Sequence, residues 1–296
     1  MPRNLRPVLL LPAVTASLTC LSPQAHAVVS YNTIDSIYNQ NFDSLPITPE
    51  NVSLGDTISG VGWTDDNATP GANQYSILGW YLYHPLVLAE GGVNGHQRMR
   101  IGAGTSNVGA FMSFGLSGST ERALGSLASN TLAAVGAEIY IGLRLTNNTG
   151  ATLNSFTLSY NGEQWRDGGA TTPNAQALNL SWSTTATAIS DASSLFTIVP
   201  QLSFTSPVFT NTGGGAAVDG NGPGRLGISA FTVEGINWLP GTDLWLRWVD
   251  LSNTGNDHGL AVDDVSFSAN TIPEPGVCAA LILGLTTLAS RRRRSP

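Results

Sequence analysis

The sequence predicts an all-β protein, a single large β-sandwich of the jelly-roll type. Only 11% of the 296 residues are charged, and glycine is abundant at 33 residues. Apolar and polar residues alternate in many short runs bounded by turn residues, a pattern typical of strands with one buried face. Roughly a dozen such strands fit a large sandwich. Two smaller sandwiches joined near residues 167–175 are the alternative.

The alternating runs give the expected order of strands. The segments with the clearest period-two pattern are 75–83, 108–114, 136–146, 151–160, 176–184, 227–233, 243–250 and 260–268. Asn147 to Gly150 favours a hairpin between two of these runs, and Asn161-Gly162 favours a turn after the second. Residues 122–134 form the one faintly helical stretch.

The first 27 residues have the pattern of a signal peptide. Arg3 and Arg6 precede an apolar stretch over 8–18, and residues 25–27 supply a small-x-small cleavage pattern. The β-sandwich ectodomain is then expected over 28–270. Both cysteines, Cys20 and Cys278, lie outside it, so its core and bound metal are the expected sources of its stability.

The charge of the expected ectodomain excludes one class of partner. Between Val28 and Ile272 the chain carries 19 acids and 7 arginines, a net charge of −12. A surface this acidic repels phosphate backbones, so nucleic acid is not expected to bind. It suits solubility and cation binding instead.

The chain ends on three distinct parts. Pro273-Glu274-Pro275 is followed by the uncharged stretch 276–290 and by four arginines, Arg291, Arg292, Arg293 and Arg294. As a helix the stretch would span about 22 Å, less than the roughly 30 Å of a bilayer core. The arginines favour a cytoplasmic end for this short transmembrane helix.

This order of parts resembles the PEP-CTERM sorting signal of exosortase substrates, over residues 273–296. The resemblance implies that exosortase recognises Pro273, Glu274 and Pro275 after export and removes the helix. It also implies a Gram-negative bacterium that makes exopolysaccharide. The protein would pass through the inner membrane and reach the outer envelope or extracellular matrix.

Residues 160–169 and 244–267, together with Phe42-Asp43, resemble a β-sandwich region of exported bacterial proteins. The resemblance implies an accessory module without an assigned activity.

A candidate ligand face comes from Glu163, Trp165, Arg166 and Arg247. An indole can stack on a sugar ring while carboxylate and guanidinium groups bind its hydroxyls. The alternative is structural: a buried tryptophan with a Glu–Arg pair, and Arg247 in a cation–π contact with Trp245 or paired with Glu163.

No motif points to an enzyme. His84, His96 and His258 are widely separated, and neither HExxH nor GxSxG occurs. Asp257-His258 lies close to Asp263, but no serine is singled out as a nucleophile. The sequence therefore predicts a non-catalytic protein that binds polysaccharide or acts in adhesion. A secreted glycan-active hydrolase using Glu163 or Asp257 is the alternative, and a purely structural matrix protein is a third possibility.

A structural calcium ion is the expected cofactor. By resemblance to jelly-roll binding modules, Asp43 near the mature start and Asp263 or Asp264 in the last strand would supply oxygen ligands. Alternation favours Asp264 as the inward residue, on the side of Val262 and Leu260. In the alternative, Asp43 caps a turn and the aspartate pair accepts hydrogen bonds from backbone N–H groups.

Overall fold

The computed structural model describes residues 29–48, 53–54, 62–66, 74–85, 99–129 and 132–271. The predicted signal peptide (1–27) and the predicted sorting signal (273–296) lie outside these ranges. Across the part of the chain that is described, no helix has both the length and the apolar character needed to cross a membrane.

The first sheet has seven strands. Its main path runs through β1 (Val29–Tyr31), β10 (Glu138–Asn147), β17 (Asp243–Leu251), β12 (Ala177–Ser183) and β13 (Thr197–Ile198). Two further strands join it at the side, β6 (Trp80–Tyr83) on β10 and β14 (Phe204–Thr205) on β12.

The second sheet has nine strands. Its path runs through β15 (Ala216–Ala217), β11 (Leu153–Asp167), β18 (Gly259–Asn270), β9 (Ala123–Leu127), β8 (Ala110–Phe114), β7 (Met99–Gly102) and β3 (Ser53–Leu54). The long strand β16 (Arg225–Trp238) also pairs with β11, and β2 (Tyr38–Gln40) pairs with β18.

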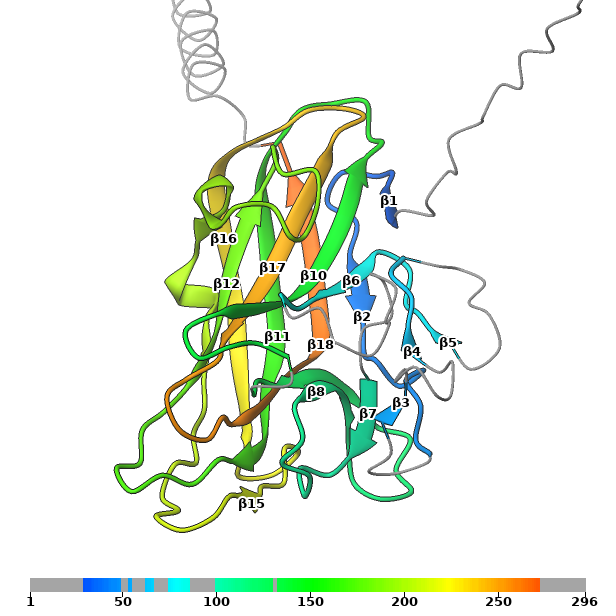
Figure 1. Ribbon diagram of the computed structural model, residues 1–296. Helices are drawn as coiled ribbons and strands as arrows, with labels where there is room; N and C mark the ends of the chain where they lie inside the picture. Colours follow the sequence, from blue (N-terminus) through cyan, green and yellow to red (C-terminus); the bar gives the residue numbers. More distant parts are fainter. Residues whose placement is uncertain are drawn as a thin grey trace, which may run out of the picture.

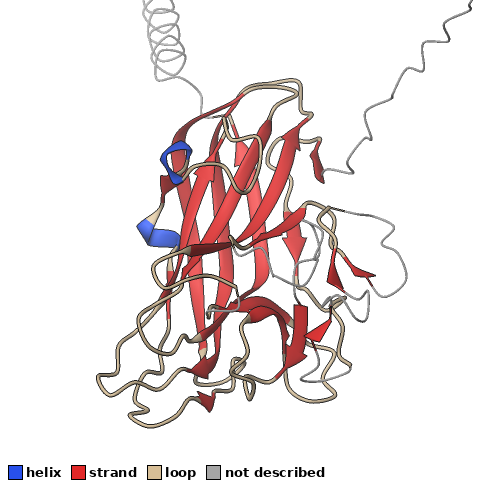
Figure 2. Cartoon of the chain, viewed as in Figure 1, coloured by secondary structure: helices blue, strands red, loops and turns tan. Residues whose placement is uncertain are grey.

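Four small elements complete the described chain. β4 (Gly62–Trp63) and β5 (Gln74–Tyr75) form a parallel pair, and two 3₁₀ helices, η1 (Ser193–Leu195) and η2 (Pro200–Leu202), follow β12 and β13. Strands and loops therefore account for nearly all of the described chain, as Figure 2 shows. The prediction of an all-β sandwich is confirmed.

The long strands of the two sheets face each other across the core (Figure 1). The main core cluster takes Ile141 and Leu246 from the first sheet, and Phe156 and Val262 from the second. Both sheets contain strands from before and from after residues 167–175. The halves of the chain on either side of that segment therefore share one pair of sheets.

Two turn predictions are wrong. β11 continues through Asn161 and Gly162 to Asp167, because Gly162 lies beneath Phe204, where a side chain would overlap the phenyl ring. Asn147 to Gly150 does connect β10 to β11, but the two strands lie in different sheets, so the turn is an arch between layers. Asn147 is buried there and donates hydrogen bonds to the carbonyl oxygens of Ala151 and Trp238.

The faintly helical stretch 122–134 instead contains the fully buried strand β9. Both faces of β9 are covered, so its residues Ala123 to Leu127 need not alternate between apolar and polar types. A buried central strand of small and apolar residues cannot be told from a helix by periodicity alone.

Candidate functional site

The residues of the predicted ligand face are all buried. Glu163 and Trp165 are 0% exposed, Arg166 is 8% exposed and Arg247 is 1% exposed. The first three lie on β11 in the second sheet, whereas Arg247 lies on β17 in the first. These four side chains do not form an exposed platform for a sugar, and that interpretation is corrected. The predicted pairing of Arg247 with Glu163 is excluded by the same placement.

Arg247 is held by aromatic rings and loop carbonyls. Its guanidinium carbon lies 4.0 Å from the ring centre of Tyr140 and 3.6 Å from that of Phe196. The guanidinium group also donates hydrogen bonds to the carbonyl oxygens of Ile189 and Asp191. Arg247 therefore fastens the 189–196 segment to the outer side of the first sheet, a structural role.

Trp165 supports Glu163 instead of stacking on a ligand. Its indole N–H donates to Oε2 of Glu163 at 2.9 Å, and its ring lies nearly parallel to Phe114 with centroids 6.0 Å apart. Gly220 lies against the indole, where an added Cβ would overlap the ring. The carboxylate of Glu163 is thereby fixed in orientation.

A β-bulge decides which of the two aspartates in the last strand turns inward. The register between β11 and β18 shifts between the pairs Ser159–Ser266 and Asn161–Asp263, and Asp264 has φ +48°. Bulges of this kind re-aim side chains and interrupt alternation. Asp263 is 4% exposed, whereas the Asp264 side chain is 49% exposed. The prediction that Asp264 points inward is wrong.

Asp264 and Asp43 have other partners. Asp264 accepts hydrogen bonds from Asn161 and Arg225, at 2.8 and 3.2 Å. Asp43 accepts from the Asn41 side chain at 2.6 Å and from the backbone N–H of Arg122 at 3.3 Å. Asp43 therefore ties its segment to the residue that precedes β9.

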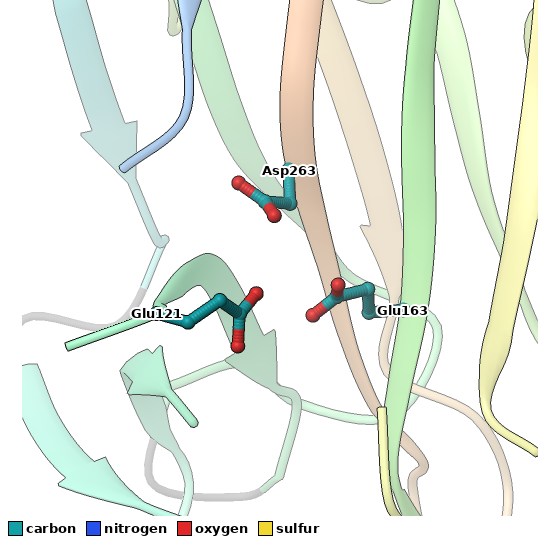
Figure 3. Close-up of side chains that lie close together, drawn as sticks. All are labelled: Glu121, Glu163 and Asp263. Atoms are coloured by element: carbon teal, nitrogen blue, oxygen red, sulfur yellow. The ribbon is translucent and has the colours of Figure 1, made fainter. Parts of the chain in front are cut away.

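The structure brings together three acids that differ as a set from the predicted calcium ligands. Glu121, Glu163 and Asp263 each place one carboxylate oxygen within 4.8 Å of the other two. Figure 3 shows the three side chains converging from separate segments. Glu121 precedes β9, Glu163 lies on β11 and Asp263 on β18. Glu121 was not among the predicted site residues, because nothing in the sequence around it indicates where the turn between β8 and β9 lies relative to β11.

Burial is the main reason that two of these carboxyl groups hold their protons more tightly. It raises the pKa of Glu163 to about 7, against the hydrogen bond from Trp165 and with the help of the charge on Glu121. It raises the pKa of Asp263 to about 8, and the charges of Asp264, Glu163 and Glu121 add to the effect. Without a cation, the three acidic groups disfavour one another's ionisation.

A serine, a histidine and an aspartate also lie together. Nδ1 of His258 is 3.0 Å from Oγ of Ser206, and Nε2 is 3.5 Å from Oδ1 of Asp167. Their exposures are 1% for Ser206, 4% for His258 and 3% for Asp167. Ser206 Oγ accepts the backbone N–H of Gln176, and Asp167 accepts those of three loop residues, Gly169, Thr210 and Asn211. The three residues join loops and leave no access for a substrate to the hydroxyl group.

A polar groove opens where β9, β11 and β17 end. It has a volume of about 620 Å³. Its side-chain polar groups include the amides of Asn107, Asn253 and Asn256, the guanidinium group of Arg166 and the carboxyl group of Asp257. Asn107 and Asn256 are exposed, whereas Arg166 and Asp257 are buried at 8% and 7% exposure. The groove therefore offers hydrogen-bond donors and acceptors at two depths.

Local contacts hold the polar groups of the groove in place. Arg166 donates to the carbonyl oxygens of Gly104 and Thr105, and Asn256 donates to that of Gly169. Asp257 accepts the backbone N–H of Asn253 at 2.7 Å. Burial raises the pKa of Asp257 to about 7, so its carboxyl group can also donate a hydrogen bond near neutral pH. The sequence analysis named Arg166 and Asp257 but missed the three asparagines, which come from two separate loops.

Comparison with known proteins assigns no family. No family model matches the chain, and no curated protein matches it. Among solved structures, the chain is similar to a xylan-binding CBM22-1 domain from Paenibacillus barcinonensis, at 10% identity and a TM-score of 0.32, with 81% of this chain and 99% of that one covered.

Two further similar structures are of the same distant kind. One is the K3 cleaved adhesin domain of Lys-gingipain from Porphyromonas gingivalis, at 12% identity and a TM-score of 0.32, covering 64% of this chain and 91% of that one. The other is TmCBM61 in complex with β-1,4-galactotriose, at 8% identity and a TM-score of 0.24, covering 52% and 74%. With TM-scores below 0.5, these likenesses assign neither a family nor a ligand to the chain.

Proposed function

We propose that this protein is exported and binds polysaccharide without cleaving it, through the polar groove that contains Asn107, Asn253, Asn256, Arg166 and Asp257. The observation that carries the proposal is the groove itself. Sugar hydroxyl groups both donate and accept hydrogen bonds, and side-chain amides do the same. A guanidinium group and a carboxyl group at the base add fixed polar contacts that can orient a sugar.

The burial of the acidic groups favours binding over hydrolysis. A glycosidase needs two carboxyl groups that flank the bond to be cleaved, about 5 Å or more apart and accessible to the polymer. Glu163 and Asp263 are almost completely buried, and the serine, histidine and aspartate at Ser206, His258 and Asp167 are too. Among the described residues that line the groove, Asp257 is the one acid.

The proposal includes sorting through the PEP-CTERM-like tail, residues 273–296. Exosortase would act on Pro273-Glu274-Pro275, and the mature protein would be delivered to the outer envelope or extracellular matrix. Intact mass measurement of protein from the native host tests this step. We expect a mature species that lacks Arg291 to Arg294, and recovery of a species that retains them would contradict it.

Binding to exopolysaccharide purified from the producing bacterium tests the proposed function. In affinity electrophoresis, we expect the polysaccharide to retard the full-length protein and Asn107→Ala to reduce the retardation several-fold. Asn179→Ala is the matched control, because Asn179 is an exposed asparagine on β12 outside the groove. Equal retardation of both variants would contradict binding in the groove.

A reducing-sugar assay on the same polysaccharide separates binding from hydrolysis. The proposal predicts no release above a blank. Release that disappears in Asp257→Asn would establish the hydrolase alternative, and the absence of both retardation and release would favour a structural matrix protein.

A further inference from the structure

We propose that Glu121, Glu163 and Asp263 form a Ca²⁺ site that fastens the second sheet to the turn between β8 and β9. This inference is independent of polysaccharide binding, since the three acids do not line the groove. It replaces the ligand set expected from the sequence, of which Asp263 alone is retained.

Two buried oxygens aim into the cluster without a partner. Glu163 Oε1 and Asp263 Oδ1 have no hydrogen-bond donor among the residues that the structure describes, although Glu163 is 0% exposed and Asp263 is 4% exposed. Buried polar atoms are nearly always satisfied, so two unsatisfied carboxylate oxygens in one acidic cluster point to a ligand. A cation is the ligand that suits a cluster in which all three groups are acids.

Arg225, which lies opposite Glu163 in the pairing of β11 with β16, does not bind these unpartnered oxygens. Arg225 is the β16 partner of Glu163, but its guanidinium group donates to Asp264 on the exposed side of the bulge. Its side chain is 42% exposed. Arg225 therefore forms its ion pair with the outward carboxylate of Asp264, and it reaches Glu163 through its charge alone.

The other oxygens of the cluster are already oriented by donors. Trp165 holds Oε2 of Glu163, and the side chain of Asn221 donates to Oε2 of Glu121. The backbone N–H of Asp264 bonds the carboxylate of Asp263. Each acid thus has one oxygen held by the protein and can turn its second oxygen toward the shared centre (Figure 3). Such outer contacts orient metal ligands.

The dimensions are compatible with Ca²⁺, and its tolerance of irregular coordination suits the site better than the near-ideal octahedron that Mg²⁺ demands. Three ligand atoms that lie within 4.8 Å of one another fit around one ion. Ca²⁺ binds oxygens at about 2.3–2.6 Å, so ligands on opposite sides lie up to about 5 Å apart, whereas Mg²⁺ at about 2.0–2.1 Å allows only about 4 Å. Ca²⁺ also accepts water in its remaining positions, which suits a site with three protein ligands.

Terbium luminescence is a direct probe, because the Trp165 indole contacts Glu163. Tb³⁺ replaces Ca²⁺ at oxygen sites and emits when a neighbouring tryptophan is excited. With the full-length protein freed of metal by a chelator, we expect sensitised emission that CaCl₂ abolishes. Calorimetric titration with CaCl₂ should give one site, and saturation at about one hundred times Kd should raise Tm by about 5–10 °C.

Matched variants separate this site from general binding by an acidic surface. Glu163→Gln and Asp263→Asn keep shape and hydrogen-bond acceptors, and we expect each to weaken Ca²⁺ binding at least tenfold and to abolish the Tm shift. Asp264→Asn and Asp43→Asn remove acids that lie close by but point elsewhere, and both should bind as the wild type does. Cooperative unfolding of each variant in chelator checks that it is folded.

Three outcomes would overturn the proposal. The first is a wild-type protein whose Tm is the same in chelator and in millimolar CaCl₂ and that gives no binding heat. The second is wild-type affinity in folded Glu163→Gln and Asp263→Asn. The third is an equal loss in Asp264→Asn or Asp43→Asn, which would assign the binding to the ligand set expected from the sequence.

Discussion

The indole N–H of Trp165 donates a 2.9 Å hydrogen bond to Oε2 of Glu163, two residues earlier on the same face of β11, and both side chains are fully buried. The bond fixes one oxygen of the carboxylate and directs the other toward Glu121 and Asp263. A tryptophan that sequence reasoning first suggested as a sugar platform thus orients an acid inside the protein.

Replacement of Trp165 by phenylalanine tests that relationship. Trp165→Phe keeps an aromatic ring against Phe114 but leaves Oε2 of Glu163 buried without a donor, which costs about 1–3 kcal/mol beyond the lost ring area. Trp245→Phe is the control, because Trp245 is equally buried and its indole N–H has no hydrogen-bond partner among the described residues. Urea unfolding in the presence of a chelator should show the larger loss for Trp165→Phe. Equal losses would mean that the bond to Glu163 contributes nothing.

The glycine at position 162 explains why a segment that looks like a turn continues as a strand. Its missing side chain leaves room for Phe204, so Gly162→Ala forces the ring to move and should cost about 1–3 kcal/mol. Gly227→Ala on the neighbouring strand β16 is the control, since its new Cβ would lie 3.6 Å from the Asn161 side chain, an ordinary contact. Thermal unfolding of the two variants should separate them, and a Gly162→Ala variant as stable as Gly227→Ala would contradict this explanation of the strand.

The positions of most long strands along the chain were predictable from the sequence, and the acidic cluster was not. Alternation predicts β10, β12, β17 and β18 closely and finds parts of β11 and β16, because each of these long strands has a face packed on the core. Alternation also predicts that Asp264 points inward, and it fails there because the β18 bulge and the left-handed backbone of Asp264 exchange the two aspartates. No local pattern marks a bulge of this kind in a single sequence.

Glu121 shows a second limit of sequence reasoning. It lies in a loop, and its distance from Glu163 depends on how β9 pairs with β18 and β18 with β11. The distance between a loop residue such as Glu121 and a strand residue such as Glu163 depends on long-range strand pairing, and this pairing cannot be read from the spacing of residues in the sequence.

Asp257 should make the stability of the protein depend on pH. Burial raises its pKa from 3.8 to about 7, so the folded state keeps a proton that the unfolded state releases near pH 4. The folded state therefore binds more protons between these values, and the free energy of unfolding should fall by about 2–3 kcal/mol from this group as pH rises from 5 to 7. Three neighbouring groups belong to the surroundings of Asp257. Asp250 is buried close to it, Arg166 lines the same groove, and the backbone N–H of Asn253 donates a hydrogen bond to its carboxyl group.

Asp257→Asn isolates this contribution, because the amide oxygen can still accept the Asn253 N–H and cannot titrate. Urea unfolding at pH 5 and pH 7, with chelator throughout, should give a smaller difference between the two pH values for Asp257→Asn than for the wild type. Identical differences would mean that Asp257 ionises with its ordinary pKa in the folded protein.

Replacement of Arg247 by lysine should lower the stability of the protein. Its planar guanidinium group packs against Tyr140 and Phe196 and bonds two loop carbonyls at once, whereas an ammonium group would replace only part of these contacts. We expect Arg247→Lys to lower the free energy of unfolding by about 2 kcal/mol or more. Arg225→Lys, in an exposed ion pair, should cost less than about 1 kcal/mol. Similar losses in the two variants would contradict the structural role of Arg247.

Anomalous diffraction from crystals of the protein grown with Ca²⁺, or soaked with Tb³⁺, tests the central claim about the acidic cluster most directly. The account predicts one strong anomalous peak bounded by carboxylate oxygens of Glu121, Glu163 and Asp263, with Asp43 and Asp264 outside its ligand shell. A peak coordinated by Asp43 or Asp264 instead, or no peak at the cluster in crystals saturated with the ion, would contradict it.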